Sequence, residues 1–110
     1  MSTAAERFAA FQTIYPNAEL VGPQEQPYAY IPELVVKSDG QSKTIGVLVQ
    51  PWADGGYTSR VYFSEKFSSK GANWNTSTIL ANMWWVCSWN NVPASVPWSE
   101  ILINHLTPLL

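Results

Sequence analysis

Charged residues are scarce in this chain of 110 residues: they make up 13% of it, while hydrophobic residues make up 46%. Soluble domains usually carry about 25% charged residues. This shortage predicts a surface that is partly covered, either by self-association or by a protein partner. The six Lys and Arg residues form no cluster, and the net charge is −2. The charge pattern therefore argues against a nucleic-acid partner.

Cysteine occurs once, at Cys87, and histidine once, at His105. A single cysteine forms no internal disulfide, and residues 1–7 show neither the basic region nor the long apolar stretch of a secretory signal. We therefore expect a cytoplasmic location. Apolar runs all fall short of the ~20 residues that span a bilayer, which argues against a membrane partner. The residues also lack the local spacings of zinc or calcium motifs, so neither a metal nor another cofactor is predicted.

The length suits one compact domain over residues 1–110. Thr3 and Glu6 have the spacing of a capping box, and apolar residues then recur at helical spacing, which predicts a helix over residues 4–15. A second helix is predicted from Pro97 onward, because proline suits a first helical turn. The face of this second helix that we expect to be buried consists of Ile101, Leu102, His105, Leu106 and Leu109.

Between the helices, residues 34–37, 44–49 and 57–63 have the composition of β-strands separated by turn signals. They predict an antiparallel meander. Residues 22–32 carry three prolines and are expected to form an irregular connection, and the polar residues 64–75 to form a loop. The predicted fold class is α+β: an N-terminal helix, a three- to four-stranded antiparallel meander and a C-terminal helix.

Residues 76–89 allow two interpretations, which differ in what they imply for Cys87. A helix capped by Asn75 or Thr76 would bury the thiol in the core. A strand over residues 84–89, favoured by its aromatic and β-branched residues, would place the thiol near the strand's exit. The strand is the preferred interpretation.

Tryptophan is the most distinctive component, with six residues in the chain. Most are expected to fill the core, but some could form an aromatic surface for a peptide or an apolar side chain of a partner. The candidate binding residues are Trp52, Trp74, Trp85, Trp89 and Trp98.

Parts of the sequence resemble the ubiquitin-conjugating (E2) and RWD domains, in particular bacterial members of that group. The Gly55-Gly56 turn and the strand that follows it to Glu65 resemble the family's third strand. The Pro93-Ala94 pair and the leucine-rich C-terminal segment resemble the region after its cysteine, and residues 84–89 resemble a Trp-rich strand. These matches cover about half the chain. The family's His-Pro-Asn motif is missing before Cys87.

The resemblance implies an E2/RWD-like fold and a role in protein interaction. It also implies a catalytic site in which Cys87 accepts the acyl group of a ubiquitin-like protein as a thioester, with Asn90 and Asn91 as candidate donors to the oxyanion. No Lys, Arg or His lies near Cys87 in the sequence to stabilise a thiolate. A noncatalytic Trp-rich binding module and a structural subunit of a homo- or hetero-oligomer are the alternatives.

Overall fold

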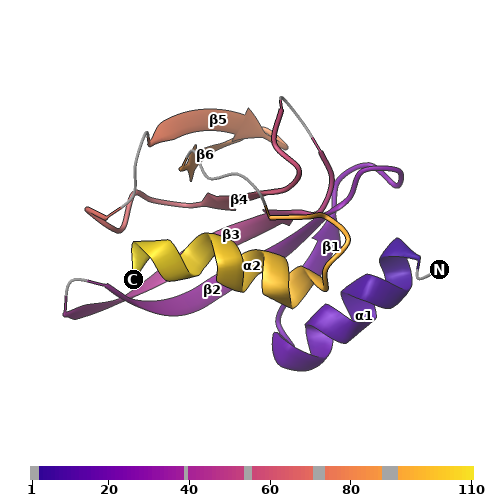
Figure 1. Ribbon diagram of the computed structural model, residues 1–110, viewed down its shortest axis with the longest axis horizontal. Helices are drawn as coiled ribbons and strands as arrows, with labels where there is room; N and C mark the ends of the chain where they lie inside the picture. The colour runs from indigo at the N-terminus through magenta and orange to yellow at the C-terminus, as the bar shows by residue number, and fades with distance from the viewer. Residues whose placement is uncertain (1–2, 39, 54–55, 71–73, 88–91) are drawn as a thin grey trace.

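The computed structural model describes residues 3–38, 40–53, 56–70, 74–87 and 92–110. Its helices are α1 (Ala4–Ile14), α2 (Trp98–Leu106) and the short 3-10 helix η1 (Thr107–Leu109). Its strands are β1 (Glu19–Val21), β2 (Tyr28–Ser38), β3 (Gln41–Gln50), β4 (Arg60–Phe63), β5 (Asn75–Ile79) and β6 (Asn82–Val86). The expected α+β class is confirmed, but the antiparallel sheet has six strands instead of three or four, in the order β1-β2-β3-β4-β6-β5 (Figure 1).

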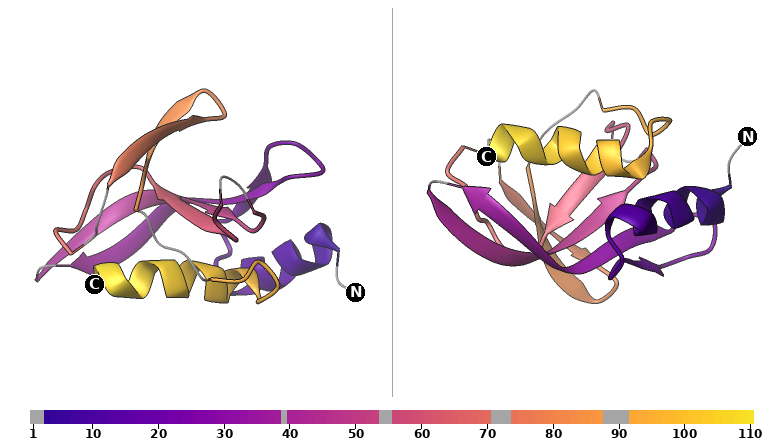
Figure 2. Two further views of the ribbon diagram at one scale, coloured as in Figure 1. Left: turned by 45° about the horizontal axis from the view of Figure 1, so that its top comes forward. Right: turned by 90° about the horizontal axis from the view of Figure 1, so that it is seen from below.

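The predicted first helix is confirmed, and so is its capping box. The Glu6 backbone N–H donates to Thr3 Oγ1 at 3.1 Å, while the Glu6 carboxylate accepts from the Thr3 backbone N–H at 3.5 Å. Arg7 then ties this helix to the segment before α2, because its Nη2 atom donates to the carbonyls of Ala94 and Val96, each at 2.6 Å. The two helices are therefore held side by side on one face of the sheet (Figure 2).

Strand β2 begins earlier than the sequence suggested. Residues 28–32 belong to it, so the expectation of an irregular connection there was wrong. The register shifts between Ile31 and Leu34, and Pro32 lies within this irregularity. Proline lacks the N–H that a regular ladder needs, and a bulge is one of the few places in a sheet that tolerates it.

Residues 75–86 form a hairpin rather than a helix. Its strands β5 and β6 are joined by the two residues Leu80 and Ala81, and β6 pairs on its other side with β4. The helical interpretation of residues 76–89 was therefore wrong. The strand interpretation is borne out for residues 84–86, although the strand begins at Asn82, and residues 88 and 89 lie outside the described ranges. The structural reason is that threonine and aromatic residues are frequent in β5 and β6, and these residue types suit a pleated surface.

The sheet has two different faces. Both helices cover one face, and the β5–β6 hairpin rises from the other, as the left view of Figure 2 shows. Between sheet and helices lies the main core, which includes Phe11, Val47, Val49, Phe63, Ile101 and Leu102. All five residues predicted for the buried face of the second helix are buried. A smaller cluster lies on the opposite, open face and contains Tyr28, Leu48, Tyr62, Ile79, Trp84 and Val86.

Candidate functional site

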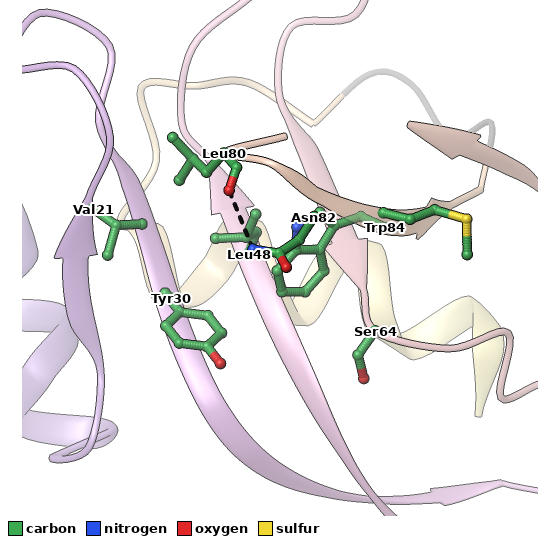
Figure 3. A pocket seen from close by; sticks show the side chains of 8 residues that line it. Val21, Tyr30, Leu48, Ser64, Leu80, Asn82 and Trp84 are labelled. Carbon is green, nitrogen blue, oxygen red and sulfur yellow. Dashed lines mark hydrogen bonds between the residues drawn. The ribbon is translucent and has the colours of Figure 1, made fainter. Parts of the chain in front are cut away.

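An apolar groove lies on the open face of the sheet, between the β5–β6 hairpin and strands β1 to β3. It encloses a cavity of about 420 Å³. The residues that line it are Val21, Tyr30, Leu48, Ser64, Leu80, Asn82, Met83 and Trp84 (Figure 3). Six of these eight side chains are apolar or aromatic, and none carries a charge. A site of this composition binds apolar, uncharged groups.

The floor of the groove is aromatic. Tyr30 of β2 meets the Trp84 ring of β6 edge to face, with ring centroids 6.0 Å apart and an interplanar angle of 82°. Leu48 of β3 lies beneath them and is buried. Alternation along each strand puts these three residues on the same face, and the order of the strands in the sheet brings them together.

The rim of the groove consists of residues at and after the hairpin turn. Leu80 and Met83 leave 46% and 61% of their surface exposed. Leu80 and Ala81 both have positive φ angles, 52° and 68°. Two-residue hairpins favour turns with positive φ angles, and the usual residues in them are Asn-Gly. Side chains larger than hydrogen strain this left-handed backbone by about 1–2 kcal/mol per residue. Backbone strain of this kind is concentrated at functional sites.

Polar atoms in the groove are few and uncharged. Ser64 Oγ accepts the Gly46 backbone N–H at 2.8 Å, and Asn82 Nδ2 donates to the Leu80 carbonyl at 3.2 Å. The indole Nε1 of Trp84 is buried without a hydrogen-bond partner. No nucleophile and base lie together among these lining residues, so the groove offers binding surface rather than acid–base chemistry.

Cys87 lies outside this groove. It follows the end of β6, is 9% exposed and belongs to the core cluster on the helix-covered side of the sheet. Asn90 and Asn91, the other candidate catalytic residues, lie outside the described ranges, as does Trp89. The structure therefore places the thiol in the core.

The remaining candidate tryptophans are dispersed. Trp98 is 2% exposed and packs beside Phe8 of α1, and Trp74 packs with aromatic side chains of the helix-side core. Trp52 supports the open-face cluster through an edge contact with Tyr28 and donates its indole N–H to the Pro27 carbonyl at 3.1 Å. Trp85 is half-buried. These residues form no common platform.

Among the described residues, the tryptophan that lines the groove is Trp84, which is not one of the candidates predicted from the sequence. One signal pointed to it. Trp84 and Trp85 are adjacent, so in a strand they must face opposite sides of the sheet. Which of the two faces the open side depends on the register between β6 and β4, and this register is set by tertiary structure.

A second polar cluster lies in the core, where His105 of α2 meets Ser59. Ser59 Oγ donates to the Val92 carbonyl at 2.7 Å and lies 3.1 Å from His105 Nε2. In the contact between Ser59 Oγ and His105 Nε2, the donor is set by the tautomer of the imidazole ring. Burial first, and the nearby charge of Arg60 second, lower the pKa of His105 to about 4. Ser59 is 1% and His105 6% exposed, so this pair fastens α2 to the sheet and is closed to substrate.

Comparison of the chain with protein-family models, with curated proteins and with solved structures finds no match. Within the described residues, no group of three or more His, Cys, Asp or Glu side chains is placed to hold a metal ion. Neither α1 nor α2, nor any other described helical segment, combines the length and apolarity needed to cross a membrane.

Proposed function

We propose that this chain is a noncatalytic protein-binding domain, and that its groove receives an uncharged, apolar side chain of a partner protein. The observation that carries the proposal is the groove itself: a cavity of about 420 Å³ with an aromatic floor, an apolar rim and no charged side chain among its described lining residues. Aromatic and apolar pockets of this kind are where single side chains contribute most to protein binding.

A protein partner fits the surroundings of the groove better than a small molecule. Leu80 and Met83, at the rim of the cavity, leave 46% and 61% of their surface exposed. A small ligand inside the cavity would leave these apolar side chains in water, whereas a protein surface would cover them. The low charge content of the whole chain, 13%, agrees with a covered surface.

Thioester transfer is less well supported. A thiolate has to reach the acyl carbonyl of the incoming protein, and Cys87 is 9% exposed within an apolar cluster. The E2/RWD-like architecture stays a proposal: helix, antiparallel sheet and C-terminal helix follow the expected order, while β5 and β1 are additions to the expected meander.

The test is a selection of random peptides displayed on phage against the intact chain, followed by affinity measurements with each enriched peptide. We expect enriched sequences to share an aromatic or large aliphatic residue. The substitution Met83→Ser should weaken their binding about tenfold, which corresponds to about 1.4 kcal/mol.

Ile103→Ser is the matched control, because Ile103 is also a large apolar residue, 49% exposed, but lies on α2 at the helix-covered side. The Ile103→Ser variant should bind the peptides with the same affinity as the unaltered chain. Equal losses in both variants, or enrichment of charged sequences only, would overturn the proposal. Binding of hydrophobic small molecules without any peptide enrichment would assign the groove to a small ligand instead.

A further inference from the structure

Strand β5 is an open edge of the sheet. It is the last strand in the order β1-β2-β3-β4-β6-β5, and no other described strand pairs with its outer side. Its five residues, Asn75–Ile79, contain neither a charge nor a proline. Proteins usually protect such edges with charged residues, prolines or bulges, because the unpaired backbone groups attract another strand. The opposite edge, β1, has only three residues and begins with Glu19.

The hairpin turn determines which backbone groups of β5 are available. Ile79 and Asn82 flank the two-residue turn, so they form a hydrogen-bonded pair of the antiparallel ladder. Hydrogen-bonded and non-hydrogen-bonded pairs alternate along such a ladder. Within the hairpin, the backbone N–H and C=O groups of Ser77 therefore bond to Trp84, and those of Ile79 bond to Asn82. Thr76 and Thr78 direct their N–H and C=O groups outward from the edge.

We propose that β5 pairs with the β5 strand of a second copy of the chain, antiparallel and centred on Ser77. In this register, Thr76 lies opposite the partner's Thr78, and Thr78 lies opposite the partner's Thr76. Each of these pairs contributes two backbone hydrogen bonds. Ser77 faces its own symmetry mate in a non-hydrogen-bonded pair. The two six-stranded sheets become one continuous antiparallel sheet with twofold symmetry.

A second copy is the favoured occupant because the edge is complementary to itself. The register satisfies all four outward-directed groups of Thr76 and Thr78 on each copy. Residues 75–79 are uncharged, so twofold symmetry brings no like charges together. Threonine pairs across neighbouring strands are favourable. The low charge content of the chain also predicts a covered surface, and pairing along β5 would cover part of it.

Such a contact is small, so the dimer should form only at high concentration. Stable interfaces usually bury more than about 1,200 Å², and one pair of five-residue strands buries less. We expect a dissociation constant in the micromolar range or above. This inference is independent of the proposed groove, whose lining residues lie on the face of the sheet rather than along the outer edge of β5.

The first test is sedimentation velocity from about 10 μM to about 1 mM. The chain of 12.3 kDa should approach twice its mass as the concentration rises. Thr78→Pro removes an outward N–H without breaking a hydrogen bond inside the hairpin, so it should leave the fold intact and abolish the dimer. Thr78→Val keeps that N–H and should still dimerise. A monomer at every concentration, or a dimer that Thr78→Pro does not weaken, would overturn the proposal.

The second test does not depend on how well a proline variant folds. In a Cys87→Ala background, Ser77→Cys should form a covalent dimer rapidly under mild oxidation, because opposed residues in a non-hydrogen-bonded pair have Cα atoms about 4.5 Å apart, within disulfide range. Thr13→Cys in the same background is the control, since Thr13 is exposed on α1, away from the edge. Equal rates of cross-linking for the two variants would overturn the proposed register.

Discussion

Replacing Ala81 by glycine should stabilise the fold, although the same substitution normally destabilises a protein. Ala81 lies in the turn between β5 and β6 with φ 68° and has an exposed side chain. Alanine in the left-handed region costs about 1–2 kcal/mol, whereas glycine adopts it freely. Glycine also gains conformational freedom in the unfolded chain, which offsets about 0.4–1 kcal/mol of this benefit. The net expectation is a gain of about 0.5–1 kcal/mol in the free energy of unfolding.

The matched control is Ala9→Gly, because Ala9 is also exposed but lies inside α1. Glycine inside a helix costs about 0.5–1 kcal/mol relative to alanine. Urea unfolding followed by circular dichroism should therefore move the midpoint upward for Ala81→Gly and downward for Ala9→Gly, with an unchanged slope in both variants. A decrease of stability in Ala81→Gly similar to that in Ala9→Gly would refute a strained turn.

Three further predictions concern the core and the rim of the groove. The pKa of His105 is lowered to about 4 in the folded chain, so as the pH falls the imidazole is protonated in the unfolded chain before it is protonated in the folded one. In urea titrations, the free energy of unfolding should therefore be highest above about pH 6.5 and fall by about 2–3 kcal/mol towards pH 4. His105→Gln should flatten that decline, and an unchanged slope would contradict the assignment. Cys87 should react with a thiol reagent slowly in the native chain and rapidly in denaturant; equal rates would show an accessible thiol. Leu80→Asn should preserve stability, because asparagine tolerates positive φ, yet lower peptide affinity about tenfold; unchanged affinity would remove Leu80 from the site.

The helices could be predicted because their signals are local. A capping box marks the start of α1, and an apolar face with helical spacing marks α2, including the buried His105. The central strands were likewise indicated by alternation and turn residues. In these segments, propensity, capping and burial all favour the same structure, which makes a prediction from one sequence possible.

The hairpin of residues 75–86 was harder, because its turn lacks the usual residues. Leu80 and Ala81 are good helix formers, and nothing in their identity indicates positive φ angles. The pairing of the hairpin with β4 supplies the tertiary contacts that override this preference. The groove depends on the same hairpin, so missing the turn also meant missing Leu80, Met83 and Trp84 as site residues.

The most direct test of the proposed groove is the signal of the Trp84 indole N–H in a proton–nitrogen NMR spectrum, followed while a selected peptide is added. This N–H is buried at the groove without a hydrogen-bond partner, and those of Trp74 and Trp98 are buried without one in the core on the opposite face. The proposal predicts that the Trp84 signal shifts with increasing peptide while the signals of Trp74 and Trp98 stay in place. A peptide that binds and shifts the Trp74 or Trp98 signals, but leaves Trp84 unchanged, would contradict it.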